Sequence, residues 1–295
     1  MSEKRVSSVK RAVRRPSFLR KKQFIGLSLA GGKTNKTCFA VLEYFPVKKK
    51  IFLVHLETRI QSEGKVSADQ KLIESLKPYQ KKSSLMAVNA PLTWPKCIRC
   101  RLKCPGYEKC KEPEILWMWK QYKKIDKKEK LKKVFTPYAE RCAEMYLAHS
   151  LEEPFYVSQA LGANMAPLAA RMFFLKKRFP AKKLIEVHPK VSLWRIGRSL
   201  GIRPTHLKKH KHAIGGEEAR HIILETLVEK DIAFIYVQDF QTMVQDSGAF
   251  DAFISALTAL LKHLGHCEPI PKNFPSSEGW IEIPKTDISW PFLVP

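Results

Sequence analysis

Four of the seven cysteines of this chain lie within one short segment, and this clustering constrains the fold more than any other feature. The pattern Cys-x2-Cys-x3-Cys-x5-Cys places them at Cys97, Cys100, Cys104 and Cys110. Thiolates this close together can surround one tetrahedral zinc ion or one iron–sulfur cluster. The sequence therefore predicts a metal-binding loop that follows directly after the apolar run 84–92.

Two features of the loop bear on which metal it holds. Its spacing is close to that of zinc knuckles, which bind single-stranded nucleic acid. It is also close to that of compact iron–sulfur loops, and Cys104-Pro105 matches the Cys-Pro step common beside such clusters. We favour zinc, because all-thiolate zinc loops are common and need no assembly machinery. A [4Fe–4S] cluster stays open as the alternative.

The net charge of +25 is concentrated in two segments. Residues 1–23 hold nine lysines and arginines against one acid, and residues 94–133 hold fourteen against five. Concentrated positive charge attracts polyanions through counterion release, and nucleic acid, DNA or RNA, is the usual partner. The basic residues expected to contact it surround the cysteines: Lys96, Arg99, Arg101, Lys103 and Lys109.

Aromatic residues are interleaved with this positive charge. They are Trp94, Tyr107, Trp117, Trp119 and Tyr122. Basic residues mixed with aromatics are typical of a surface on which nucleic-acid bases stack. The same side chains are equally compatible with the core of a small subdomain, and the sequence leaves both interpretations open.

The cellular setting follows from what the chain contains. It has no apolar stretch near the ~20 residues of a membrane span and no secretory pattern at its N-terminus. Clustered cysteines in an otherwise cysteine-poor chain suit a metal site in a reducing compartment. We therefore expect a soluble cytoplasmic protein without a membrane partner, and the sequence leaves its oligomeric state open.

Hydrophobic patterns predict an α/β fold with a mixed sheet. Three strand-like runs joined by short turns predict an antiparallel meander, and a helix then leads to a strand parallel to the first. Further helices and short strands follow, which is the order of a ribonuclease H-like sheet flanked by helices. The expected strands are 24–30, 37–45, 51–60, 85–88, 183–189 and 279–284, and the clearest helices are 68–79, 163–178 and 250–264.

The predicted domain organisation interrupts this core once. The core comprises residues 24–92 and 151–284, and residues 93–150 form a cysteine-rich and lysine-rich helical insertion. Residues 1–23 read as a disordered basic arm, with an organellar transit peptide as the alternative, and residues 285–295 read as a C-terminal tail.

Six short motifs occur in an order that is typical of one family. The motifs are Ile25-Gly-Leu-Ser-Leu-Ala-Gly-Gly32, Ala87-Val-Asn-Ala-Pro-Leu92, Leu161-Gly-Ala-Asn-Met-Ala-Pro-Leu168, Ile185-Glu-Val-His-Pro189, Phe250-Asp-Ala-Phe-Ile-Ser-Ala-Leu-Thr-Ala259 and Glu278-Gly-Trp-Ile-Glu-Ile-Pro284. In these motifs the chain resembles the proteins grouped as domain of unknown function 429, described as predicted nucleases of ribonuclease H-like fold, over about residues 24–284.

The resemblance implies a divalent-metal site. Nucleases of this fold hold Mg²⁺ or Mn²⁺ with carboxylates at strand ends and on a nearby helix. Glu186 and Asp251 match the acidic positions of the family, and Ser28 and Asn89 stand where its members carry aspartate. His188 is then a candidate general base or metal ligand, although a structural histidine fits its position before a proline equally well.

The missing aspartates leave three possibilities for this site. The protein uses one metal ion, a nearby acid such as Asp246 or Glu43 substitutes, or a degenerate site is kept for binding. Taken singly, Glu186 also suits a salt bridge at a strand end and Asp251 an acid at a helix N-terminus.

The predicted function is nucleic-acid binding with divalent-metal-dependent phosphodiester hydrolysis. One alternative is a non-catalytic nucleic-acid-binding protein with a structural metal centre. A less favoured one is an ATP-dependent phosphotransferase, because residues 25–34 resemble a phosphate-binding hairpin in which Lys33 and Thr34 would contact phosphate.

Overall fold

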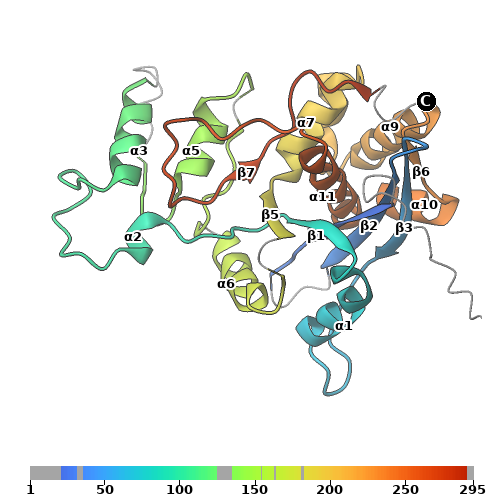
Figure 1. Cartoon of the computed structure of the whole chain (residues 1–295), viewed down its shortest axis with the longest axis horizontal. Helices are drawn as coiled ribbons and strands as arrows, with labels where there is room; N and C mark the ends of the chain where they lie inside the picture. The colour runs from blue at the N-terminus through green and yellow to red at the C-terminus, as the bar shows by residue number, and fades with distance from the viewer. Residues whose placement is uncertain are drawn as a thin grey trace, which may run out of the picture.

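The fold is mixed α/β, with one mixed seven-stranded sheet flanked by helices, as the sequence predicts (Figure 1). The computed structural model describes residues 21–31, 36–124, 135–153, 155–162, 164–180 and 183–290. The expectations for the arm at 1–20, for Lys33 and Thr34 and for the final five residues lie outside this part of the chain.

The strands lie in the order β6-β3-β2-β1-β4-β5-β7. β2 pairs antiparallel with β1 and β3, whereas the β1–β4, β4–β5, β5–β7 and β3–β6 pairs are parallel. The predicted meander and the parallel fourth strand are therefore confirmed. The bounds are β1 Lys22–Ser28, β2 Cys38–Phe45, β3 Lys50–Glu57, β4 Ser83–Val88, β5 Leu184–Val187, β6 Ala233–Phe234 and β7 Ile281–Glu282.

Helices cover both faces of the sheet. Figure 1 shows α1 and α6 on one side and α7 and α11 on the other. The bounds are α1 Ala68–Gln80, α2 Lys96–Arg99, α3 Pro113–Lys124, α5 Cys142–His149, α6 Met165–Lys176, α7 Pro189–Ser199, α8 Pro204–Lys209, α9 Gly216–Glu229, α10 Val237–Gln245 and α11 Ser247–His263. Within the described residues, no helix is both long and apolar enough to cross a bilayer.

Alternation along β1 assigns its side chains to two separate cores. Phe24 belongs to the core under α11, whereas Ile25 and Leu27 belong to the core under α1 and α6. Successive side chains of a strand point to opposite faces, so Gly26 and Ser28 face α11 with Phe24. Whether a residue at the end of a strand can contribute to a site beside α11 therefore depends on which face of the sheet its side chain occupies.

The helix α11 packs directly on the backbone of β1. A Cβ atom added at Gly26 would lie 2.0 Å from the carbonyl oxygen of Ala252 and 2.3 Å from the amide nitrogen of Ala256. Only a glycine permits this approach. Main-chain packing therefore fixes where α11, and with it Asp251, stands beside the end of β1.

The predicted insertion contains α2, α3 and α5, which lie together at the left end of the molecule in Figure 1. Its aromatics pack on one another: the ring centroids of Trp119 lie 6.0 Å from Tyr107 and 4.7 Å from Phe135. Trp94 stacks on Phe173 of α6 at 4.0 Å. This packing favours the subdomain-core interpretation of the aromatic residues over a base-stacking surface.

Candidate functional site

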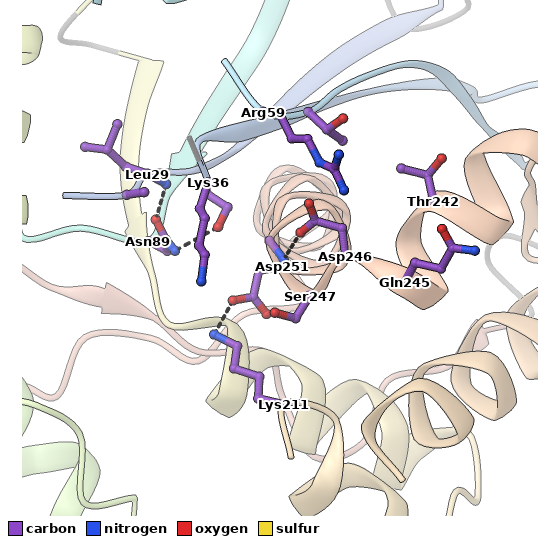
Figure 2. Close-up of a pocket in the computed structure, with 14 residues that line it drawn as sticks. Leu29, Lys36, Arg59, Asn89, Lys211, Thr242, Gln245, Asp246, Ser247 and Asp251 are labelled. Atoms are coloured by element: carbon purple, nitrogen blue, oxygen red, sulfur yellow. Dashed lines mark hydrogen bonds and ion pairs between the residues drawn. The ribbon is translucent and has the colours of Figure 1, made fainter. Parts of the chain in front are cut away.

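A polar cleft opens at the carboxyl ends of β1 and β4, beside the N-terminus of α11 (Figure 2). Its volume is about 970 Å³. In open α/β sheets, ligands commonly bind outside the carboxyl ends of the strands. We call this space the carboxyl-edge cleft; its charged and polar lining includes Ser28, Lys36, Thr58, Arg59, Asn89, Lys211, Gln245, Asp246, Ser247 and Asp251.

Ser28 and Asn89 lie where the sequence places them, side by side in the cleft. The Oδ1 atom of Asn89 accepts a hydrogen bond of 2.7 Å from the backbone N–H of Leu29, and its amide nitrogen donates one of 3.2 Å to the Oγ atom of Ser28. These two bonds hold the ends of β1 and β4 together. The Ser28 hydroxyl accepts in its bond with Asn89 and donates to no other described residue, so its hydrogen is available to a ligand.

Asp251 reaches the cleft from α11 and is almost completely buried. Its Oδ2 atom pairs with the ammonium group of Lys211, as Figure 2 shows. Among the described residues, its Oδ1 atom has no hydrogen-bond partner. The Nε2 atom of His210 lies 3.9 Å from that atom.

His210 presents a second unsatisfied acceptor. Burial lowers the pKa of His210, although the charge of Asp251 opposes this shift. Its Nδ1 atom lies 3.0 Å from the carbonyl oxygen of Leu207, so in the neutral ring Nδ1 donates and Nε2 carries the lone pair. Two buried acceptor atoms, from His210 and Asp251, thus face each other. A hydrogen-bond donor or a cation between them would satisfy both.

Three cationic side chains reach the cleft from separate segments: Lys36, Arg59 and Lys211 (Figure 2). Arg59 has a φ of 54°, in the left-handed region that non-glycine residues seldom adopt. Such residues cluster at functional sites, where the surrounding structure maintains the strain. Lys211 is paired with Asp251, so the excess of positive charge over the two cleft carboxylates, Asp246 and Asp251, comes from Lys36 and Arg59 and favours an anion beside them.

Asp246 has a structural task within the cleft. Its Oδ1 atom caps α11 by accepting hydrogen bonds from the backbone N–H groups of Gly248 and Ala249, at 2.7 and 3.2 Å. Such caps satisfy amide groups that have no partner within the helix. The other acid considered as a substitute is Glu43. It pairs with Lys21 and Gln23 near the start of β1, so it lies at the opposite end of this strand from the cleft.

Glu186 does not line the carboxyl-edge cleft. It pairs in register with Val88, whose side chain belongs to the core under α1 and α6. Both side chains of such a parallel pair point to the same face, so Glu186 points away from α11. The structure therefore separates the two acids, Glu186 and Asp251, that the resemblance would bring together around a metal ion.

A buried arginine holds Glu186 instead. The guanidinium group of Arg141 donates to its carboxylate at 2.9 and 2.5 Å, and the N–H of Leu92 donates at 2.8 Å. Arg141 also pairs with Glu144, which completes its capping box at the start of α5. Burial lowers the pKa of Arg141, but the charges of Glu144 and Glu186 outweigh this and hold it well above its ordinary range.

His188 immediately precedes α7 and is not among the residues that line the cleft. Burial, reinforced by the positive charge of Lys211, lowers the pKa of His188 from 6.5 to about 3. Its ring is therefore neutral at neutral pH. A base this weak, outside the cleft lining, fits the structural role better than the general-base role, because an efficient catalytic base has a pKa near the working pH.

The described residues do not fit a two-metal centre. Among them, no group of three or more histidine, cysteine, aspartate or glutamate side chains is arranged to hold a metal ion. The available carboxylates are already engaged: Asp251 by Lys211, Asp246 by the helix N-terminus and Glu186 by Arg141. Two divalent ions need several free oxygen ligands, and this cleft does not supply them.

The four clustered cysteines come together at a second pocket, which we call the cysteine pocket. Cys97, Cys100, Cys104 and Cys110 all line it, each with a free thiol, and its volume is about 370 Å³. Burial raises the pKa of Cys97 to about 11, and the other three thiols contribute in the same direction. All four cysteines therefore border one pocket, but within the described residues they are not arranged as a group of three or more that could hold a metal ion, so the predicted metal centre stays a prediction.

The five basic residues predicted to contact nucleic acid divide into two groups. Arg101, Lys103 and Lys109 are exposed beside the cysteine pocket. Lys96 pairs with Glu112 at 2.5 Å and Glu114 at 3.3 Å, and Arg99 pairs with Glu278 at 3.0 Å. The first group is available to a polyanion, and the second ties the cysteine loop to its neighbours.

The sequence pattern identifies only part of the cationic lining. Lys211 lies in the conspicuous basic run 208–212, but Lys36 and Arg59 stand in loops with no local pattern that distinguishes them. The turn that positions Arg59 follows β3, and only the sheet order brings it near β1 and α11.

Comparison with known proteins gives one match. A family model described as "Protein of unknown function (DUF429)" matches residues 47–276. Neither the curated proteins nor the solved structures contain a significant match to the chain.

Proposed function

The chain belongs to the family described as Protein of unknown function (DUF429), and from this premise we propose that it is a nucleic-acid-binding protein whose carboxyl-edge cleft holds a backbone phosphate. One observation carries the proposal: Lys36, Arg59 and Lys211 converge on the cleft. Arginine and lysine side chains are the usual partners of phosphate oxygens, arginine through two parallel hydrogen bonds.

The charge of the whole molecule supports a polymeric anion over a small one. The net charge is +25, and much of it lies outside the cleft, including the exposed Arg101, Lys103 and Lys109. A small phosphorylated ligand would require charge at one site only. Positive charge at several sites instead fits a partner with many phosphates.

The strand arrangement supports a ribonuclease H-like fold for this family member. The meander β1-β2-β3 joined to the parallel strands β4 and β5 gives the order 3-2-1-4-5, in which β2 alone is antiparallel among these five. This is the arrangement of strands expected for that fold. Fold alone does not assign an activity, so the proposal depends on the lining of the cleft.

A second candidate function is phosphodiester hydrolysis with a single Mg²⁺ or Mn²⁺ ion. One observation favours it: the buried Oδ1 atom of Asp251 and the Nε2 atom of His210 face each other without partners among the described residues. A single ion would find two ligands there, with Lys211 displaced toward the phosphate. The proposal of binding does not require this ion.

Salt-dependent binding tests the proposal. Labelled single- and double-stranded DNA and RNA would be titrated with the wild type, Lys36→Ala and Arg59→Asn, since asparagine tolerates the left-handed backbone. Each lost phosphate contact should weaken binding and lower the slope of log K against log salt by about one. Lys77→Ala is the matched control, because Lys77 is exposed near the C-terminus of α1, which leads to the opposite end of β4.

The outcomes separate the two candidates. Binding that is insensitive to salt, or equal losses in Lys77→Ala and the cleft variants, would refute the phosphate site. Cleavage assays with Mg²⁺ or Mn²⁺ on the same substrates would then address hydrolysis. Cleavage by the wild type that disappears in Asp251→Asn would establish the enzyme, and binding without cleavage would establish the binding protein.

A further inference from the structure

Four aromatic side chains form a row across the edge of the sheet that contains β2, β3 and β6. The ring centroid of Phe52 lies 5.3 Å from that of Phe45 and 5.5 Å from that of Phe234. The ring of Tyr236 follows at 5.2 Å from Phe234. Phe52 pairs in register with Phe234 and with Glu43, two residues before Phe45, so these rings share one face of the sheet. We call the four residues the aromatic row.

The aromatic row is exposed because the helix on its side of the sheet packs elsewhere. Ile51 and Leu53 belong to the core under α11, so Phe52 between them faces the layer of α1. That helix packs on β1 and β4, whereas β3 and β6 lie at the edge of the sheet (Figure 1). The exposed fraction is 50% for Phe234 and 59% for Tyr236. A group of exposed apolar side chains on a folded protein often marks an interaction site.

Positive charge adjoins the row at the turn between β2 and β3. Lys48 and Lys49 are exposed there, directly after the strand that carries Phe45. Within the described part of the chain neither pairs with an acid, whereas the next residue, Lys50, pairs with Asp231. Surfaces that bind single strands combine aromatic rings, on which bases stack, with cations that follow the backbone. We infer that the aromatic row and the two turn lysines bind single-stranded nucleic acid by stacking on its bases.

Two observations favour this partner over a protein. Lysine is depleted in protein–protein interfaces, yet two unpaired lysines stand beside the row. A second copy of the chain would bring two molecules of net charge +25 together, which electrostatic repulsion opposes. A single strand fits better than a duplex, because only its bases have faces that are free to stack. The inference rests on the proposed nucleic-acid binding and adds to it the strand state and a second contact surface.

Binding measurements on the full chain test the inference. A labelled single strand and the duplex of the same sequence would be titrated over a range of salt concentrations. We expect Tyr236→Ala to weaken single-strand binding by about tenfold at every salt concentration and to leave the duplex unaffected. The slope of log K against log salt should not change, because stacking releases no counterion. Lys48→Ala should instead lower this slope by about 0.7, the value for one phosphate of a single strand.

Two control variants isolate the aromatic contact. Tyr236→Phe keeps the ring and should bind like the wild type. Phe174→Ala removes a ring of α6 that is exposed to a similar degree, 48%, and should also bind like the wild type. The Tyr236 side chain makes no capping hydrogen bond at the start of α10, so its replacement should leave the fold intact, which circular dichroism would verify.

A direct measurement on the wild type does not depend on any variant. A single strand that carries iodouracil would be irradiated in the complex, and mass spectrometry would locate the crosslinked residue. A crosslink at Phe234 or Tyr236 would support the inference. Crosslinks confined to other segments would overturn it, and so would single-strand binding by Tyr236→Ala that equals that of the wild type.

The remaining outcomes distinguish this surface from the carboxyl-edge cleft. Binding that depends on Lys36 and Arg59 but not on Tyr236 would refute the stacking surface alone. A wild type that binds no nucleic acid at low salt would refute both proposals. Sedimentation would show a dimer that dissociates in Tyr236→Ala if a second copy covered the row, and this result would also overturn the inference.

Discussion

Glu186 and Asp251 face opposite sides of the same sheet. Glu186 is aligned with Val88 and points toward the layer of α1 and α6, where Arg141 binds it. Asp251 stands on α11, on the other face, where it pairs with Lys211. The two acids therefore serve different parts of the molecule: one anchors the insertion to the core, and the other lines the carboxyl-edge cleft.

The Arg141–Glu186 pair should contribute strongly to stability. Replacement of one partner of a buried pair leaves an uncompensated charge, which typically destabilises a protein by about 3–5 kcal/mol. We expect a loss of this size for Arg141→Met, because Glu144 and Glu186 would both lose their cation. Urea denaturation would measure the free energy of unfolding.

Two further variants check this explanation. Arg198→Met removes an exposed arginine and should change the stability by less than about 0.5 kcal/mol. The double variant Arg141→Met, Glu186→Gln should recover part of the loss, since one buried charge is removed with its partner. Equal stability of Arg141→Met and the wild type would contradict a role for this pair.

The contact between β1 and α11 should tolerate no side chain at Gly26. In Gly26→Ala the new Cβ atom would meet the backbone of Ala252 and Ala256, and a helix backbone cannot shift cheaply. We expect a loss of at least about 3 kcal/mol, or a protein that does not fold. Gly31→Ala is the control, because no described residue lies within 4 Å of its added Cβ; thermal denaturation would compare the two.

His188 should make the fold sensitive to acid. Its folded pKa of about 3 lies below the ordinary value of 6.5, so the unfolded chain binds the proton more readily. The stability should therefore fall as the pH decreases from about 6.5 toward 3, by an amount on the order of a few kcal/mol at the low end.

Comparison of variants isolates this contribution from those of other groups. His188→Gln removes the titrating ring and should flatten the stability profile between pH 6.5 and 3, whatever its effect at neutral pH. His221→Gln, at a partly exposed position on α9, should leave the profile as it is. Parallel profiles for the wild type and His188→Gln would contradict the assignment.

Asp246 should stabilise α11 through its cap rather than its charge. Asp246→Ala removes the acceptor for Gly248 and Ala249 and should cost about 1 kcal/mol. Asp246→Asn keeps an acceptor oxygen and should cost much less. Chemical denaturation would measure both, and equal losses would show that the charge near the helix N-terminus, not the cap, is what stabilises α11.

Local patterns predicted much of the fold. The continuous apolar run of β2 marks a strand that is buried on both faces, the apolar residues of β1 mark a second strand, and the long apolar pattern of α11 marks a helix packed on them. The short strands β6 and β7 carry weaker signals, because two residues cannot display a period. Their places depend on tertiary pairing with β3 and β5.

The sequence did not reveal which face of the sheet Glu186 occupies. In Leu-Ile-Glu-Val, either Glu186 or Val187 can face α11, and the pairing with β4 decides between them. A shift by one residue would turn Glu186 toward Asp251. No pattern in a single four-residue strand contains that information, and neither does it reveal that Arg141, forty-five residues earlier, binds Glu186.

The close approach of α11 to β1 has a consequence for recognition. With no side chain between the two backbones at Gly26, the separation of Ser28 and Asp251 cannot adjust to the size of a ligand. Adaptation is left to the long, flexible arms of Lys36 and Lys211 at the rim. For the proposed phosphate ligand, this arrangement predicts a fixed binding distance beside Ser28 and Asp251 and adjustable contacts from the two lysines.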